Sequence, residues 1–222
     1  KEPGLSCILG PERAALAPYA TDFGRTTTTY PDAALVPRTI DEVKTVLRFA
    51  QTHRIPVALR GAGHAASRLT LRSAGMVVDM RGLGNVLQID EQKLHIDIEG
   101  GASWGALLQS TLARGLVPLT TVDWQTLTVG GTISTGGVGV QAFWAGVHAD
   151  QVMELDLIMG TGELVRASAH ENADIFDLAR GGLGHAGAIV RARMPLMPAP
   201  SHVQVFEFFY ATAAEVFKDL EL

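Results

Sequence analysis

The chain has 222 residues, 47% of them hydrophobic, and its 18 Lys and Arg against 23 Asp and Glu leave a net charge of −5. This composition excludes a disordered chain and predicts neither a nucleic-acid nor a membrane partner, because it lacks an excess of basic residues and any apolar run near the roughly 20 residues of a membrane helix. The chain has one cysteine, Cys7, which excludes a disulfide framework. Its seven histidines lack metal-ligand spacing, so the sequence predicts no metal site.

The first half of the chain predicts strands and helices in turn. The expected elements are a loop over 1–30, a strand at 33–36, a helix at 40–53, strands at 55–59, 76–80 and 94–98, and a helix at 103–114. Thr39 and Glu42 have the spacing of a capping box at the start of the first helix, and Gly115 suits the position after the second. Apolar and polar residues alternate over 94–98, which predicts a half-buried strand.

The second half of the chain predicts two glycine loops and more strands than helices. The expected elements are a glycine loop at 130–139, a hairpin of strands 152–159 and 163–167 turning at 160–162, a helix at 172–179, a glycine loop at 181–187, a strand at 188–194, a strand at 203–210 and a helix from 212. Strands and helices mix without strict alternation, so the sequence predicts an α+β fold. Pro195, Pro198 and Pro200 indicate a domain boundary.

The end of the chain predicts the beginning of another domain. The strand at 203–210 and the helix from Thr212 are amphipathic, and nothing in the sequence is left for their apolar faces to pack on. We expect one domain over residues 1–200, and over 201–222 the start of a truncated substrate or cap domain. The unpartnered strand and helix lead us to expect a fragment, or one product of a cut polypeptide. No signal segment follows Lys1, so we expect it to be located in the cytoplasm.

A glycine loop at residues 60–66 (RGAGHAA) directly follows the strand at 55–59. Glycines allow successive backbone N–H groups to converge on a phosphate. The string also fits the dinucleotide fingerprint of a Rossmann unit, with Asp79 about 20 residues further on. That alternative is disfavoured, because residues 66–75 are too few and too polar to form the crossover helix. For this string alone, a plain structural turn remains an alternative.

The loop at residues 128–139 places glycines among hydroxyl side chains and is not followed by the Gly-Lys-Ser/Thr of a nucleotide triphosphatase loop. Such a loop suits a polar, extended ligand. A glycine-rich surface loop is the alternative, but ordering so many glycines is entropically costly unless a ligand offsets the cost. A third loop at 181–184 precedes an apolar strand. Together the three loops predict a dinucleotide held by several segments.

The ordered set of strings resembles the FAD-binding domain of the vanillyl-alcohol oxidase (PCMH-type) flavoproteins, and most of all that of cytokinin dehydrogenases. The strings that carry the resemblance are RGAGHA at 60–65, TTVDWQTLTVGGTIS at 120–134, QAF at 141–143, ELDLIMGTGELV at 154–165 and LARGGLGHAGAIVRARM at 178–194. The likeness covers roughly residues 30–200. It implies a PCMH-type fold of two α+β subdomains with bound FAD.

The resemblance also implies which residues hold the cofactor. The matching positions are Gly61, Ala62, Gly63, His64, Ala65, Asp123, Thr128, Gly131, Thr132, Ser134, Gly137, Val138 and Ile189. In the family, the histidine matched by His64 carries the flavin through a covalent bond; an ordinary loop histidine is the alternative. The family often has Ser where this chain has Ala65, which removes one hydroxyl. Thr126 stands where doubly tethered relatives have cysteine, so we expect no second bond, and Cys7 is a bystander.

Asp123 is the candidate catalytic residue. It matches the aspartate that cytokinin dehydrogenases place beside the flavin as a proton acceptor, and its neighbours Val122 and Trp124 are expected to desolvate it. An aspartate that caps its own turn is the alternative. We assign no role to His185 and expect Trp104 and Trp144 to be core or interface residues rather than a substrate platform.

The leading hypothesis is an FAD-dependent oxidoreductase. It would transfer hydride from a C–H bond beside an amine or alcohol of a small-molecule substrate to flavin N5, with FAD tethered to His64 and Asp123 as proton acceptor. The alternative is an FAD-binding fragment without turnover, which needs a missing C-terminal substrate domain or a companion chain. Either hypothesis requires FAD.

Overall fold

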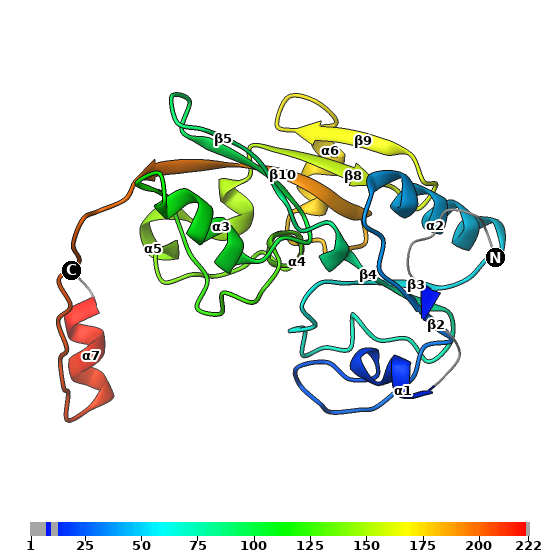
Figure 1. The fold of residues 1–222 in the computed structure, drawn as a ribbon. Coiled ribbons are helices and arrows are strands. Elements are labelled where there is room, and N and C mark those ends of the chain that lie inside the picture. Colours follow the sequence, from blue (N-terminus) through cyan, green and yellow to red (C-terminus); the bar gives the residue numbers. More distant parts are fainter. Residues whose placement is uncertain (1–7, 10–12, 221–222) are drawn as a thin grey trace.

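The computed structural model describes residues 8–9 and 13–220 and contains two β-sheets with helices packed on them (Figure 1). Sheets and helices mix without strict alternation, which confirms the predicted α+β class. Cys7 lies outside the described residues.

The smaller sheet carries the strand that leads into the first glycine loop. Its strands β2 (Ala33–Leu35), β4 (Met76–Asp79) and β3 (Val57–Arg60) run parallel, and β1 (Ile8–Leu9) pairs antiparallel with β2. Helix α2 (Ile40–Thr52) packs an apolar face on this sheet. Strands β2, β3 and β4 and the helix agree with the expected elements to within a few residues, whereas β1 lies in the expected loop over 1–30.

One of the two bonds of the capping box predicted for α2 is formed, while the Glu42 carboxylate bonds to the residue before the N-cap. The hydroxyl of Thr39 accepts a hydrogen bond from the Glu42 backbone N–H at 3.2 Å, and the Glu42 carboxylate accepts one from the backbone N–H of Arg38 at 2.6 Å. The bond to Thr39 satisfies one of the N–H donors that the first turn of a helix leaves unpaired.

The larger sheet is antiparallel, with the long strand β10 at its centre. Its order is β5 (Val86–Asp90), β6 (His95–Glu99), β10 (Ala188–Pro198), β8 (Glu154–Ile158) and β9 (Leu164–Ser168), with β7 (Leu116–Pro118) paired to the far end of β10. The β8–β9 hairpin was predicted, whereas β5 and β7 were not. Helices α3 (Trp104–Leu112), α4 (Val129–Ser134) and α6 (Ala173–Ala179) bury apolar side chains on one face of this sheet.

Pro195 does not end β10, so the strand extends past residue 194, which the sequence predicts as its end. Pro195 pairs with His95, and the strand continues to Pro198. On the other side of β10, Arg193 pairs with Glu154, the first residue of β8, and Leu196 pairs with Pro118, the last residue of β7. The N–H that proline lacks therefore falls in a gap between two partner strands and interrupts no ladder.

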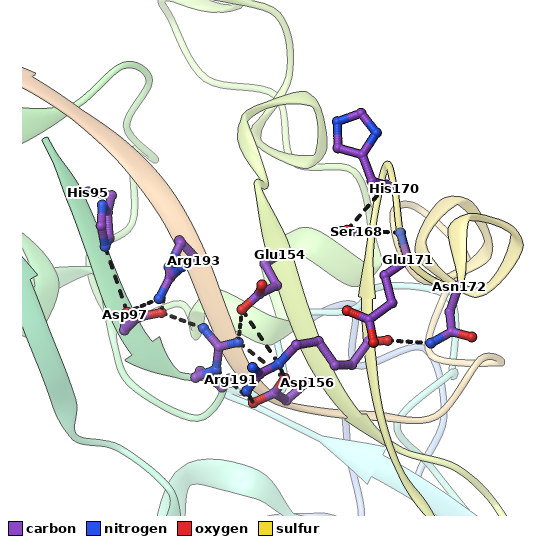
Figure 2. A network of polar contacts seen from close by, with 11 residues as sticks. His95, Asp97, Glu154, Asp156, Ser168, His170, Glu171, Asn172, Arg191 and Arg193 are labelled. Atoms are coloured by element: carbon purple, nitrogen blue, oxygen red, sulfur yellow. Dashed lines mark hydrogen bonds and ion pairs between the residues drawn. The ribbon is translucent and has the colours of Figure 1, made fainter. Parts of the chain in front are cut away.

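The opposite face of the larger sheet carries a network of ion pairs, shown in Figure 2. Arg191 on β10 bonds to Asp97 on β6 and to Glu154 and Asp156 on β8, and Arg193 reaches Asp97 at 2.8 Å. This network buries Asp97, so β6 is buried on both faces and the expectation of a half-buried strand at 94–98 is wrong.

The network also sets the pKa values of its acids. Burial acts to raise the pKa of Asp97, but hydrogen bonds and charge from Arg193 and Arg191 outweigh burial and lower it. The pKa of Asp156 is lowered in the same way, by Arg191 and Arg166 against burial. Both acids are therefore held as carboxylates and contribute stability that is lost only as the pH falls below their ordinary pKa.

A β-bulge in β10 separates a residue that packs in the core from a residue of the ion-pair network. The pairing with β8 shifts between Ile189 and Arg191, which leaves Val190 as the extra residue. Ile189 belongs to the core under α3 and α4, while Arg191 points to the other face.

Two segments expected to be loops contain helical turns. Residues 129–134 form α4, so the loop begins only after Ser134. Residues 13–19 form α1 (Arg13–Leu16) and the 3-10 turn η1 (Ala17–Tyr19), whose Leu16 and Tyr19 are buried against the smaller sheet. The other short helical segments are η2 (Met80–Gly82), α5 (Ala142–Ala145) and η3 (His148–Gln151).

The strand expected at 203–210 is not formed, although helix α7 (Ala213–Leu220) is. Figure 1 shows this segment and α7 extending away from both sheets. Among the described residues no strand pairs with 203–210, and its side chains are exposed, Phe209 at 93%. A high β propensity does not form a strand where no neighbouring strand supplies hydrogen bonds.

Candidate functional site

A cavity of about 750 Å³ opens between the two sheets, walled by the loop after β3, by α4 with the residues around it, and by the loop before β10. It contains every residue that sequence reasoning assigned to the cofactor. They are Gly61, Ala62, Gly63, His64, Ala65, Asp123, Thr128, Gly131, Thr132, Ser134, Gly137, Val138 and Ile189. Segments more than 100 positions apart in the sequence thus meet at one site.

The loop after β3 presents unpaired backbone donors. In the described part of the chain, the N–H groups of residues 62–65 donate no hydrogen bond, while the carbonyls of Gly63 and Ala65 accept from the N–H of Phe23 at 3.0 and 3.2 Å. Gly63 has a φ of +78°, which favours glycine, and a Cβ at Gly61 would overlap the hydroxyl of Thr128. Backbone donors left free in this way form a concave site for an anion.

Arg60 is a buried cation beneath this loop, and sequence reasoning missed it. Its side chain is close to where a Cβ of Gly63 would stand, and the residue is 8% exposed. Its hydrogen bonds go to neutral oxygens, the hydroxyl of Thr70 at 3.3 Å and the carbonyl of Pro18 at 3.2 Å. Burial lowers the pKa of Arg60, against the opposing charge of Asp79. Its position directly before the first glycine was the available sequence signal.

His64 lies in an aromatic cluster at the cavity wall. Its ring stacks on Phe23 with 4.9 Å between centroids, and meets Trp124 edge to face at 5.1 Å. Phe23 and Trp124 also contact each other at 5.3 Å. Phe23 follows the buried Asp22, whose carboxylate accepts from the N–H of Arg68 at 2.9 Å and so ties the N-terminal segment to the loop that carries His64.

Asp123 lines the cavity but is exposed, so the expected burial by its neighbours is wrong. Trp124 is itself 54% exposed, because the loop that carries both residues lies at the open side of the cavity. Among the described residues, the carboxylate of Asp123 has no hydrogen bond or ion pair. It is therefore accessible to a ligand in the cavity.

The wall formed by α4 is supported from behind by Trp104, which is fully buried as expected. Its indole N–H donates to the hydroxyl of Thr132 at 2.9 Å. Gly137 follows with a φ of +62°, and a side chain there would overlap Thr132. Trp144, by contrast, is exposed.

The loop before β10 is tied to the same wall. Its backbone N–H groups at Gly181 and Leu183 donate to the carbonyls of Ile133 and Ser134 at 2.9 and 2.7 Å. Leu183 and His185 join Ile189 in lining the cavity. Sequence reasoning had assigned no role to His185.

The Rossmann alternative finds no support in this arrangement. No helix lies between β3 and β4, which the structure describes in full. Asp79, the candidate for a ribose contact, is buried and bonds to the hydroxyl of Tyr19 at 3.1 Å and to Arg81. Over residues 8–9 and 13–220, no group of three potential ligand side chains is placed to bind a metal ion, and no helix has the length and apolar character to cross a membrane.

Comparison with known proteins gives two kinds of relative. The family described as FAD binding domain matches residues 31–168. A cytokinin dehydrogenase from Oryza sativa subsp. japonica is 40% identical over 95% of this chain, and one from Arabidopsis thaliana is 35% identical over 91%. The chain spans 41% and 40% of the length of these two relatives.

A solved structure shares the fold. That of 6-hydroxy-D-nicotine oxidase from Arthrobacter nicotinovorans superimposes with a TM-score of 0.79, at 21% identity, over 86% of this chain and 42% of that one. The fold, the cavity and the family match agree. The chain therefore belongs to the FAD-binding domain family, of the PCMH type found in vanillyl-alcohol oxidase-like and cytokinin dehydrogenase-like flavoproteins.

Proposed function

We propose that this chain is the FAD-binding part of an oxidoreductase that transfers hydride from a C–H bond beside an amine or alcohol to FAD. The observation that carries the proposal is the single cavity lined by all the residues assigned to the cofactor. Its volume of about 750 Å³ lies in the range of about 300–1,000 Å³ of ligand pockets. The relatives named as dehydrogenase and oxidase support this class of reaction.

The pyrophosphate of FAD fits the loop after β3. Unpaired N–H groups at residues 62–65 are donors for phosphate oxygens, and the guanidinium of Arg60 supplies positive charge beneath them. Arg60 bonds only to neutral oxygens, so its charge is available to a bound anion. Ala65 in place of the family's serine leaves the amide in position.

His64 is the proposed point of covalent attachment. Stacking on Phe23 and the edge contact with Trp124 restrict the orientation of the imidazole, which supports a histidine held for one geometry rather than an ordinary loop residue. Bound FAD would supply the hydride acceptor. No matching cysteine exists at Thr126 for a second bond.

Asp123 is the proposed proton acceptor. Removing the proton of a substrate N–H or O–H makes departure of hydride from the adjacent carbon easier. Its carboxylate lies in the cavity wall without a partner in the described residues, which supports this role over that of a turn cap.

Turnover would need more chain than the described domain. Residues 203–210 and α7 expose Val203, Phe206, Phe209 and Phe217, an apolar surface that suits packing within a second domain. We propose that residues 201–222 begin a substrate domain, supplied by the same polypeptide or by a companion chain. An FAD-binding unit without turnover of its own is the second candidate.

The absorption spectrum of the purified protein tests the cofactor, and denaturation tests the bond. We expect a flavin spectrum that remains with the denatured chain and loses its covalent fraction in His64→Ala. His185→Ala is the matched control, because His185 lines the same cavity. Flavin released from the denatured wild type would contradict the bond alone, and a protein that cannot be loaded with FAD would contradict the function.

A further inference from the structure

His148 is a fully buried histidine that the proposed function does not use. The residue is 0% exposed at the start of η3, and its ring meets that of Trp104 edge to face at 4.7 Å. It does not line the cavity, but it lies directly behind the wall formed by Thr132 and Gly137.

One carbonyl receives two contacts from His148. The backbone N–H donates to the Gly137 carbonyl oxygen at 2.8 Å, and ring Nδ1 lies 2.8 Å from the same oxygen. A carbonyl only accepts, so Nδ1 carries the ring proton. Burial lowers the pKa of His148, which favours the neutral ring and leaves Nε2 as a bare acceptor.

This carbonyl determines where the next amide points. In a trans peptide the C=O and the following N–H point in opposite directions. With the Gly137 carbonyl held toward His148, behind the wall, the N–H of Val138 points away from His148, and Val138 itself lines the cavity. That N–H donates to no other group among the described residues.

Two buried polar atoms near this point lack partners in the described structure: Nε2 of His148 and the hydroxyl of Thr120. Both lie beside Gly139. A Cβ on Gly139 would stand 2.5 Å from Thr120 Oγ1 and 3.0 Å from His148 Cε1, the carbon bonded to Nε2. The carbonyl oxygen of Thr121 adjoins the same point.

We propose that one water molecule is bound between His148 and Thr120, and that His148 positions the Gly137–Val138 peptide so that it donates to the cofactor. The water donates to Nε2 and to the Thr121 carbonyl and accepts from the Thr120 hydroxyl. Three such partners are typical of a buried water. The water is inferred from the fold alone, whereas the donor to FAD rests on the proposed function.

The thermal stability of the apoprotein tests whether the water is present, because its presence decides whether Thr120→Val lowers the midpoint of unfolding. Thr120→Val removes a partner of the water, so we expect a lower midpoint of thermal unfolding. If the space is dry, the same change removes an unsatisfied buried hydroxyl and leaves the midpoint unchanged or raised, which overturns the proposal. Thr111→Val is the matched control, because its buried hydroxyl bonds to the Leu108 carbonyl at 3.3 Å.

A double-mutant cycle locates the effect. When His148→Leu has already removed Nε2, Thr120→Val should cost less than it does in the wild type, because the two side chains share one water. Additive changes would overturn the bridge. A crystal structure with no water between the two atoms would overturn it as well.

The affinity for FAD tests the positioning role. We expect His148→Leu to weaken FAD binding about tenfold, close to the loss of one hydrogen bond. His148→Asn should retain most of the affinity, since its amide N–H can donate to Gly137 in place of Nδ1. Equal affinity in the wild type and His148→Leu overturns the role. A wild type that binds no FAD contradicts the proposed function instead and leaves the stability test valid.

Discussion

The ring of His64 stacks on the ring of Phe23, with 4.9 Å between centroids and 14° between the planes. The two residues lie 41 positions apart, and the backbone N–H of Phe23 also bonds to the carbonyls on both sides of His64. The N-terminal segment therefore fixes both the loop and the ring.

Phe23→Ala should slow attachment of FAD to His64. A misplaced reacting group can cost up to about 100-fold in rate, so we expect a decrease of at least about tenfold. The fraction of flavin that stays with the denatured chain, followed in time after adding FAD to apoprotein, measures it. Phe143→Ala is the control, because Phe143 is exposed and lies outside the cavity lining. Equal rates in both variants would argue against the stacking role.

Arg60→Met should weaken FAD binding without lowering the stability of the apoprotein. The guanidinium is buried against neutral oxygens, so replacing it with an apolar side chain leaves no carboxylate unpaired among its hydrogen-bond partners. Removing a charge-assisted contact to phosphate should cost about 1.5–3 kcal/mol of binding free energy. Titration with FAD and with ADP, which shares the diphosphate, measures it.

Arg72→Met is the control for Arg60, because Arg72 also lines the cavity but is exposed and bonds to the Val57 carbonyl at 2.9 Å. We expect a much smaller loss of affinity, since solvent screens an exposed charge. A lower apoprotein stability together with unchanged FAD affinity in Arg60→Met would make Arg60 purely structural.

The stability of the apoprotein should fall as the pH drops below about 6.5, the ordinary pKa of histidine. Burial lowers the pKa of His148 in the folded state, so the unfolded chain binds the proton more readily. The contribution of His148 is complete above that pH and is lost as the pH falls toward its folded-state pKa. Denaturant unfolding at a series of pH values measures it.

His148→Gln should flatten this dependence, because the substituted side chain does not titrate. Asp97 and Asp156 have lowered pKa values, so their contribution is lost only below a pH of about 3.8, whereas the loss from His148 begins near pH 6.5. An unchanged pH profile in His148→Gln would assign the acid sensitivity to another group.

Arg191→Met should destabilise the fold by up to about 3–5 kcal/mol, since it removes the most buried cation of the network and leaves its acids only the more exposed Arg193 and Arg166. FAD affinity should not change in the folded protein, because no residue of the network lines the cavity. Arg166→Met is the control. Its side chain is 54% exposed, and exposed ion pairs contribute at most about 1 kcal/mol. Guanidinium chloride unfolding of both variants measures the difference.

The glycine loops could be predicted from the sequence because their motifs are local. Phe23, Arg60 and His148 could not, because each acts through contacts that depend on the tertiary fold. Helix α4 was missed for the same reason. In the sequence, Gly130 is typical of a loop. In the structure its N–H donates to the Gly100 carbonyl at 2.7 Å, and a side chain at Gly130 would crowd that backbone. Here glycine permits close packing of a helix and does not mark a loop.

The position of strand β10 was predicted, but which of its side chains lie on which face of the sheet could not be. Only the β-bulge sends Ile189 and Arg191 to opposite sides, and a bulge has no clear sequence signal here. The same holds for 203–210, whose β propensity alone does not determine pairing.

The bulge has a consequence for how this domain tolerates insertions and deletions. Side chains alternate along a strand, so a shift of one residue exchanges its faces. Deleting Val190 would restore regular pairing and leave Ile189 and Arg191 on opposite faces, but it would remove a fully buried side chain from the core under α2. Deleting Ala192 instead would carry the Arg193 guanidinium to the apolar face under α3 and α4. Length changes that preserve the packing on both faces of β10 are therefore confined to the loops that flank the strand, and alignments of homologues should show a gap-free block across residues 188–193.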